Sequence, residues 1–348
     1  MIRLALADQA HHPPIHEEIA RAVESAAAAA DFACERLRDP GREGEFDVVL
    51  MLGHPQFYPA FLRQRGATRR LCWYGENLPP AAASPAQALL RRLPSARMLD
   101  VAHDIGGRAT ASRTRRWILA ARERAAIERE WGRNVRRLRA ARRWVDELVV
   151  TSSCRSNGAR LAGWHARWVP FGYQAEVYGP LVPPETPRDI DVLFIGRDVF
   201  ARGRRARWLA EFKRRSHSSF SLTVVDAGLY GSERQALLAR TKVVLDINRV
   251  PGNPAGLRYV MATAGGAAMV SEASDDDWLP DGGASVVEAP VDELHAAVER
   301  LLEDEERRRE LVNAGQRILG DELAMTTCLR RVVMGAGYPG RPPRIAAR

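Results

Sequence analysis

Lysine is almost missing from this chain, which has only Lys213 and Lys242 among its 52 basic residues. Long apolar runs are missing too: no stretch approaches the roughly 20 apolar residues that a membrane-spanning helix needs. The apolar run at the start, residues 2–7, is too short for a signal peptide and is typical of a first buried strand. We therefore expect a cytoplasmic protein with no transmembrane segment.

Cysteine is sparse, and its spacing excludes the common metal motifs. The four cysteines lie far apart, in no CxxC or His/Cys pattern: Cys34, Cys72, Cys154 and Cys328. This spacing favours free thiols in a reducing compartment over a zinc site. The acidic run 275–277 follows no plausible strand end, so we predict no DxD-like metal site. We expect neither a bound metal nor a cofactor.

The charge that is present is mostly arginine. The net charge is +9, and a genome rich in G and C produces such an arginine bias by itself. One region exceeds that background: from Arg108 to Arg143 there are thirteen arginines against three glutamates, which gives a strong positive potential. Two interpretations stay open. The arginines form a solvated helix face, or they dock an anionic partner such as a phosphate-bearing acceptor, a nucleic acid or a lipid headgroup.

The first half alternates short apolar runs with helical segments. Strands are predicted at 2–7, 32–37, 47–53, 70–74, 97–102 and 148–151. Helices are predicted at 15–30 and at 113–147, where apolar residues recur near a 3.5-residue period. The run 47–53 is apolar nearly throughout, as expected of a strand that is covered on both faces.

After the proline-rich linker at 179–187, the alternation starts again. Strands are predicted at 190–195, 221–225, 242–247, 267–270 and near 284–287, and helices at 202–215, 232–240, 254–264, 291–302 and 306–318. Strands that alternate with helices of this length indicate a parallel sheet. The fold class is therefore α/β, with two facing Rossmann-like domains and a cleft between them. Ligands of such sheets bind at the carboxyl ends of the strands.

Two strand ends in the second half carry phosphate-binding chemistry. One buried strand ends at Gly196 and is followed by arginines, namely Arg197, Arg202, Arg204 and Arg205. The planar guanidinium fork binds phosphate oxygens bidentately, and a helix N-terminus adds a favourable dipole. The next polar strand end gives Asn248 and Arg249, then Gly256 and Arg258 in a helix start, with Gly266 and Glu272 further on.

These segments, taken in order, resemble the spore-maturation-protein-B-like glycosyltransferases, a branch of the GT-B fold related to the family-4 glycosyltransferases. The similar pieces are LVVTS at 148–152 with WVPFGY at 168–173, DVLFIG at 191–196, KVVLDIN at 242–248 and RYVMATAGG at 258–266. The resemblance covers about residues 148–320. It implies metal-independent transfer of a hexose or pentose from a nucleoside diphosphate sugar.

The chain departs from the family pattern at two positions. Family-4 enzymes have two glutamates eight positions apart near the donor, and the aligned residues here are Asn253 and Met261. The second glutamate commonly binds the ribose, and a thioether accepts hydrogen bonds too weakly to replace it. The ribose is then held by another group, such as Glu272 or a backbone carbonyl, or the donor site is altered or lost.

The resemblance also implies how the chain is divided. Residues 1–172 would be the acceptor-binding domain, 173–322 the nucleotide-sugar-binding domain, and 323–348 a helix and tail that return to the first domain. Candidate acid–base groups at strand ends are His103, Asp104 and Glu76, with His11, His12 and His54 as weaker candidates. In retaining enzymes of this fold, the leaving phosphate itself takes the acceptor's proton.

Two functions remain open. The first is a glycosyltransferase whose donor is a nucleotide sugar and whose acceptor carries a hydroxyl or amine, with a polyanionic acceptor as one form. The second is a catalytically degenerate GT-B module that binds a nucleic acid or an anionic surface. For the first, we expect Arg258→Ala to abolish donor binding while leaving the fold intact.

Overall fold

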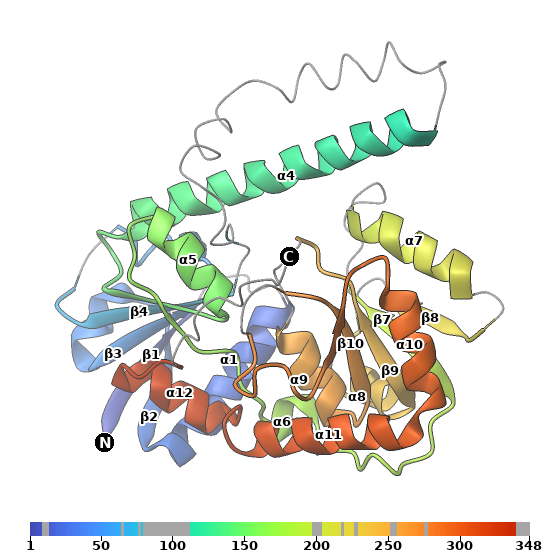
Figure 1. Ribbon diagram of the computed structural model, residues 1–348. Coiled ribbons are helices and arrows are strands. Elements are labelled where there is room, and N and C mark those ends of the chain that lie inside the picture. The colour runs from blue at the N-terminus through green and yellow to red at the C-terminus, as the bar shows by residue number, and fades with distance from the viewer. Residues whose placement is uncertain are drawn as a thin grey trace.

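The protein consists of two parallel-sheet α/β domains that lie side by side (Figure 1). The computed structural model describes residues 1–8, 14–63, 66–75, 78, 112–196, 204–216, 219–225, 229–250, 256–274 and 278–338. The predicted strand 97–102 lies outside these residues. None of the helices within them is long and apolar enough to cross a bilayer.

The N-terminal sheet has six parallel strands in the order β2-β1-β3-β4-β5-β6. The strands are β1 (Ile2–Ala7), β2 (Phe32–Leu37), β3 (Val48–Leu52), β4 (Arg69–Tyr74), β5 (Glu147–Val150) and β6 (Arg167–Trp168). Its main helices are α1 (Pro14–Ala27), α4 (Ser112–Ala141) and α5 (Ser153–Leu161). All five residues of β3 are buried, as its nearly continuous apolar sequence predicts for a central strand.

The C-terminal sheet has five parallel strands in the order β11-β10-β9-β7-β8. The strands are β7 (Ile190–Ile195), β8 (Leu222–Val225), β9 (Thr241–Asp246), β10 (Ala268–Glu272) and β11 (Val287–Ala289). The helices of this half are α6 (Ala175–Tyr178), α7 (Arg204–Ser216), α8 (Gly231–Ala239), α9 (Gly256–Ala264), α10 (Leu294–Glu303) and α11 (Glu305–Gly320). Because every strand pair is parallel, the carboxyl ends of all five strands lie at one edge.

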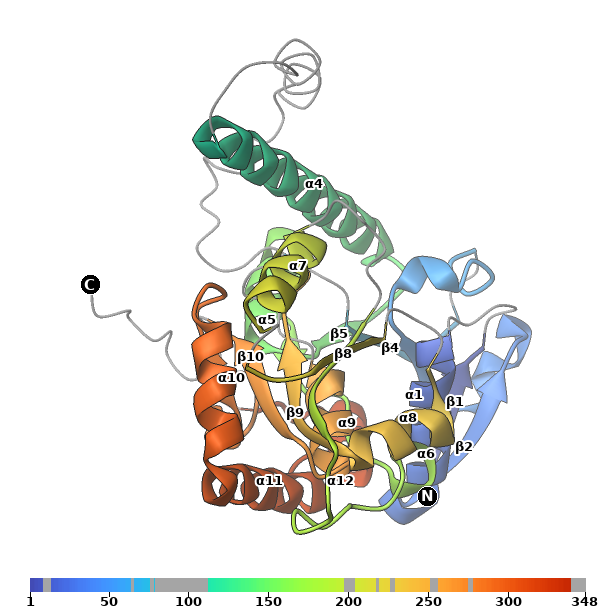
Figure 2. The same ribbon diagram turned by 90° about the vertical axis from the view of Figure 1, so that its right-hand side faces the viewer.

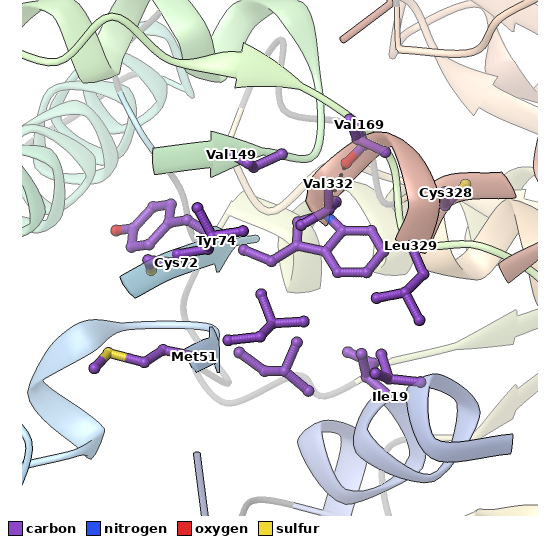
Figure 3. Close-up of a cluster of buried hydrophobic side chains, with 14 of the residues drawn as sticks. Ile19, Met51, Cys72, Tyr74, Val149, Val169, Cys328, Leu329 and Val332 are labelled. Atoms are coloured by element: carbon purple, nitrogen blue, oxygen red, sulfur yellow. Dashed lines mark hydrogen bonds between the residues drawn. The ribbon is translucent and has the colours of Figure 1, made fainter. Parts of the chain in front are cut away.

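Helix α12 (Met325–Met334) returns from the second domain to the first. Its side chains Cys328, Leu329 and Val332 are fully buried. In Figure 3 Leu329 lies close to Ile19 of α1, and all three side chains belong to one apolar cluster with Ile19 and residues of the N-terminal sheet. The last described helix therefore completes the core of the N-terminal domain.

Several element boundaries differ from the sequence prediction, and the structure explains three of them. The α1 helix stops at Ala27, and a short 3₁₀ turn follows and ends at Asp31, whose φ of 63° is left-handed. Helix α4 ends at Ala141 and not at 147, because Asp146, just before β5, already pairs with the backbone of Arg70 in β4. Strand β11 begins three residues later than 284, since 281–285 form a turn in which the Asp281 carboxylate accepts from two backbone N–H groups.

A buried ion pair joins the two domains. The Arg234 guanidinium of α8 donates to the Glu18 carboxylate of α1 at 2.8 Å, and both side chains are only 2% exposed. The Gly231 N–H at the start of α8 donates to the other oxygen of Glu18. The ring of Tyr178 lies 6.0 Å from the guanidinium carbon. Helix α1 of the first domain is thereby fixed to the start of α8 in the second.

We predict that Arg234→Met lowers the free energy of unfolding by about 3–5 kcal/mol, because it leaves the charge of Glu18 buried without its partner. Adding Glu18→Leu in the same chain should recover part of the loss, since the pair is then replaced by apolar groups. Arg307→Met, in an ion pair whose side chains are 51% and 57% exposed, should cost less than about 1 kcal/mol. Urea unfolding measures all three, and equal losses for Arg234→Met and Arg307→Met would contradict the prediction.

Candidate functional site

The candidate site lies at the carboxyl edge of the C-terminal sheet, where β7, β9 and β10 end. Arg258 on the first turn of α9 links two of these strand ends. Its Nε donates to the Ile195 carbonyl at 2.9 Å, and its Nη1 forms an ion pair with the Asp246 carboxylate. Asp246 is fully buried, so Arg258 neutralises a charge inside the domain as well as lining its edge.

A second arginine–carboxylate pair closes the other side of the edge. The two terminal nitrogens of Arg204, the first residue of α7, hold the two carboxylate oxygens of Glu272 at the end of β10. Arg204 also donates to the Asn248 carbonyl at 2.8 Å, and the Asn248 N–H donates to Glu272 Oε2 at 3.1 Å. Both carboxylate oxygens of Glu272 are therefore already engaged. Oε1 accepts one of these hydrogen bonds and Oε2 accepts two, so the carboxylate of Glu272 chiefly positions Arg204 and the backbone of Asn248.

Asn248 supplies a free acceptor at this edge. The side chain is 1% exposed, and its Nδ2 donates to the Glu272 carbonyl at 3.4 Å, which fixes the orientation of the amide. Its Oδ1 is buried and has no hydrogen-bond partner in the described chain. Buried side-chain oxygens rarely lack a partner, so this atom is suited to a hydroxyl or N–H group of a ligand.

Two guanidinium groups converge on Gly196. A Cβ atom placed on Gly196 would stand 2.9 Å from Arg258 Nη2 and 3.5 Å from Arg205 Nη1. Arg205 is held by a hydrogen bond from its Nε to the Ile247 carbonyl at 2.9 Å. Arg258 Nη2 makes no hydrogen bond to a described residue, so this N–H fork is open. Glycine at 196 keeps the space in front of both groups clear.

Burial, and to a smaller degree the positive charge of Arg205, lowers the pKa of Arg258 to about 9. Arg258 therefore remains charged at neutral pH. The two guanidinium groups also stack near the ring of Phe194, with their central carbons 5.6 Å (Arg258) and 5.8 Å (Arg205) from its centroid. Two positive charges held this close attract an anion with more than one charge, because such an anion relieves the repulsion between the arginines.

The structure brings together five of the residues that the sequence predicted for donor binding: Gly196, Arg205, Asn248, Arg258 and Glu272. Arg249 lies beside them, and its guanidinium pairs with Glu130 of α4 at 2.9 Å. Gly256 begins α9 with open space around it. The predicted residues Arg197 and Arg202 lie outside the described residues, as do the catalytic candidates Glu76, His103 and Asp104. The same holds for His11, His12, Asn253 and the acidic run 275–277.

Gly266 is a correction. It follows the C-terminus of α9, whereas the arginines gather at the N-terminal end, about 13 Å away for nine residues at 1.5 Å each. Gly266 has a φ of +71°, and a Cβ there would meet Arg188 and the Val182 carbonyl. Its small size serves the opposite edge of the sheet. Met261 is half-buried and packs against two apolar clusters.

Arg188 occupies that opposite, amino edge. It donates to the carbonyls of Leu238, Ala239, Thr241 and Gly265 and so caps the C-terminal ends of α8 and α9. A surface cavity of about 180 Å³ lies beside it, with Lys242 and Arg308 in its lining. Lys242 is paired with Asp191, and Arg308 donates to the last carbonyls of α10. We assign these cations a structural role.

The carboxyl edge of the N-terminal sheet holds His54, two residues after the end of β3. Its Nδ1 accepts from the Gln56 N–H at 3.1 Å, so the hydrogen sits on Nε2, which is buried without a partner in the described chain. Burial, and then the charge of Arg137 on α4, lowers the pKa of His54 to about 4. His54 is thus a neutral hydrogen-bond donor at pH 7. It is not a general base in this state.

Sequence reasoning missed Asp246 and Glu18, the buried partners of Arg258 and Arg234. The signal for Asp246 was present: a carboxylate that ends a buried apolar strand, followed by an arginine at the start of the next helix. Glu18 gave no such signal, because its partner lies 216 positions away. Among the described residues, no group of three His, Cys, Asp or Glu is placed to hold a metal ion.

Comparison with known proteins agrees with this architecture. Residues 185–331 match a protein-family model described as "Glycosyl transferase-like". Alr3699/HepE of Anabaena, solved with UDP and glucose, has a TM-score of 0.51 at 11% identity, over 96% of this chain and 99% of that one. The β-glucosyltransferase of phage T4 has a TM-score of 0.52 at 10% identity, with the same coverage. No curated protein matches. The predicted fold class is confirmed: the chain has the GT-B fold.

The expectation that Arg258→Ala leaves the fold intact conflicts with the ion pair to Asp246. We predict that this variant lowers the free energy of unfolding by about 3–5 kcal/mol, because Asp246 stays charged and buried. Adding Asp246→Asn removes that charge and should recover part of the loss. Urea midpoints of the three proteins decide it. If Asp246→Asn recovers none of the lost free energy of unfolding, the prediction is wrong and the buried charge of Asp246 is not the cause of the loss.

We predict that His54 makes the protein less stable in acid. The unfolded side chain titrates near pH 6.5 and the folded one near 4, so the unfolded state binds more protons between these values. The contribution is complete above pH 6.5 and is lost as the pH falls, by about 3 kcal/mol at most. His54→Phe should show a weaker fall in urea midpoint between pH 6.5 and 4. Parallel curves for the two proteins would contradict the buried neutral state.

Proposed function

We propose that the protein is a glycosyltransferase that moves a sugar from a nucleoside diphosphate sugar to a hydroxyl- or amine-bearing acceptor. The observation that carries this is the convergence of Arg205 and Arg258 on Gly196, at the carboxyl edge of the domain that matches the glycosyl transferase-like model. The GT-B fold and the family resemblance of residues 148–320 support it. The resemblance further favours a metal-independent hexosyl- or pentosyltransferase.

The proposed donor geometry follows from the positions of the guanidinium groups and from the buried Oδ1 of Asn248, which lacks a hydrogen-bond partner in the described chain. Arg258 Nη2 and the Arg205 guanidinium bind the diphosphate in front of Gly196. The Oδ1 of Asn248 accepts a hydrogen bond from the ribose or the base, in the place of the glutamate that Met261 replaces. Glu272 acts indirectly, because its carboxylate positions Arg204 and the backbone of Asn248. In this proposal the donor site needs no carboxylate at position 261.

The transfer step places negative charge where the arginines are. The acceptor oxygen or nitrogen forms a bond to the anomeric carbon, while the bond from that carbon to the diphosphate breaks and leaves its electron pair on the phosphate oxygen. Arg205 and Arg258 stabilise this developing charge, and such preorganised groups supply a large share of catalysis in many enzymes. The acceptor's proton passes to a protein base, for which His103, Asp104 and Glu76 are our candidates, or to the departing phosphate.

UDP is the first probe because two proteins of this fold were solved with UDP or a UDP-sugar. We predict that one nucleotide in a panel of UDP, GDP, TDP, ADP and CMP, each with and without its sugar, raises the melting temperature by a few degrees. A ligand at 100 times its Kd stabilises the folded state by about 2.7 kcal/mol. The shift should persist in EDTA if no metal takes part.

Arg205→Ala should weaken binding of the responding nucleotide by about 10- to 100-fold, the value of one hydrogen bond to a charged group. Arg214→Ala is the matched control, since it removes the same side chain from the same helix at a site that is 71% exposed. Equal affinity of Arg205→Ala and wild type would place the site elsewhere. No response from any nucleotide would favour the second function, a degenerate GT-B module that binds a polyanion.

A further inference from the structure

One face of α4 carries arginines that nothing in the described protein neutralises. Arg129, Arg133 and Arg136 are exposed and form no hydrogen bond or ion pair with any described residue. They are spaced four and three residues apart, which places them on the same side of a helix. We call these three residues the arginine face of α4.

The rest of the helix fixes this face outward. Asn134, Leu138 and Ala141 are buried on the opposite side. The indole N–H of Trp164 donates to the Leu138 carbonyl at 3.1 Å and ties the helix to the segment after α5. Helix α4 therefore cannot turn its arginines toward the body of the domain without breaking this packing.

Two acids, Glu128 and Glu130, lie in this part of α4, each turned about 100° around the helix from the centre of the arginine face. Glu130 of α4 pairs with Arg249, which follows β9 in the other domain. That ion pair neutralises one charge of each sign and leaves the arginine face uncompensated. Three like charges within two helical turns raise the local potential and lower the helix stability slightly. Both effects are reversed by a partner that supplies several negative charges in a row.

The spacing fits a phosphodiester backbone. Residues 129 and 136 are about 10 Å apart along a helix that rises 1.5 Å per residue. A nucleic-acid strand presents one phosphate per 3.4 Å along the duplex axis, so each arginine can reach its own phosphate. Guanidinium groups bind phosphate oxygens bidentately.

Two other polyanionic partners fit less well. Membrane-surface helices combine cations with apolar side chains that enter the bilayer. Among residues 127–141, the part of α4 whose side chains are described, there is no exposed large hydrophobic residue. Single strands are held by aromatic side chains that stack on the bases. Trp131, the tryptophan among the described side chains of α4 (residues 127–141), is half-buried and lies off the arginine face.

We propose that the arginine face of α4 docks on the phosphate backbone of a duplex nucleic acid, without reading its sequence. In both views α4 runs across the top of the molecule, from the N-terminal sheet toward α7 (Figures 1 and 2). The ion pair between Glu130 and Arg249 lies next to Asn248 at the carboxyl edge of the C-terminal sheet. A duplex along α4 therefore lies over the same side of the molecule as the candidate site. The docking itself does not depend on the proposed sugar transfer.

The test measures fluorescence anisotropy of a labelled DNA duplex of about 20 base pairs and arbitrary sequence, with wild-type protein between about 50 and 200 mM salt. Arg129→Gln, Arg133→Gln and Arg136→Gln are combined in one variant, since glutamine keeps the helix propensity. We expect this variant to bind at least about tenfold more weakly at the lowest salt. The slope of log K against log salt should become less negative by about 3, one unit for each phosphate that is no longer neutralised.

The matched control combines Arg214→Gln, Arg307→Gln and Arg309→Gln, three arginines elsewhere whose side chains are 71%, 51% and 48% exposed and each paired with a glutamate. It changes the net charge by the same amount and should bind DNA within about threefold of wild type. An equal loss in both variants would overturn the proposal, because binding would then follow net charge alone. Absence of wild-type binding at the lowest salt would overturn it as well.

Further measurements distinguish a duplex from a single strand or a membrane, and distinguish this proposal from the proposed sugar transfer. A single strand of the same length should bind more weakly than the duplex. Vesicles of phosphatidylserine and phosphatidylcholine should not compete with the duplex. If the wild-type protein binds the vesicles but not the duplex, and the α4 variant loses vesicle binding, the partner is a membrane and the proposal is overturned. The nucleotide-induced melting shift should be unchanged in the α4 variant. If the wild-type protein binds DNA but no nucleotide raises its melting temperature, the proposed donor site fails and the proposal for the arginine face of α4 stands.

Discussion

Two buried arginine–carboxylate pairs hold the carboxyl edge of the C-terminal sheet together. Arg258 with Asp246, and Arg204 with Glu272, connect the first turns of α9 and α7 to the ends of β9 and β10. Buried charges of this kind persist only when each has its partner. The positions of Gly196, Asn248 and Arg205 all follow from these pairs. These contacts hold the arginines in place without a ligand, and groups positioned in advance are the kind that stabilise developing charge in a transition state.

The same residues serve the fold and the site, and this explains why their roles are hard to separate by truncation. Arg258 uses two of its nitrogens for the strand ends and leaves the third for a ligand. Asn248 uses its N–H, its carbonyl and its amide nitrogen for structure and leaves Oδ1. The open atoms, rather than whole side chains, define the candidate site.

Much of the architecture was predictable from the sequence, because strands such as 190–195 and helices such as α11 have clear periods and clear ends. The arginines and Asn248 were predictable as well, since parallel strands place their carboxyl ends together. Three things were not. Gly266 was predicted to shape the donor pocket, but it follows the C-terminus of α9, at the end of the helix away from the arginines. Helix α4 ends at Ala141, although its apolar period was predicted to continue to 147. Glu18 and Arg234 meet only because of how the two domains are oriented, and no local pattern encodes that.

The position of α12 has a consequence for how the chain is made. Cys328, Leu329 and Val332 fill the core beside α1 (Figure 3), although they come near the end of the chain. A ribosome adds roughly 5–20 residues per second, so the first domain waits many seconds for the helix that closes its core. During that time the apolar faces of α1 and the N-terminal sheet are exposed. The last described helix to leave the ribosome is the one that completes the domain that was begun first.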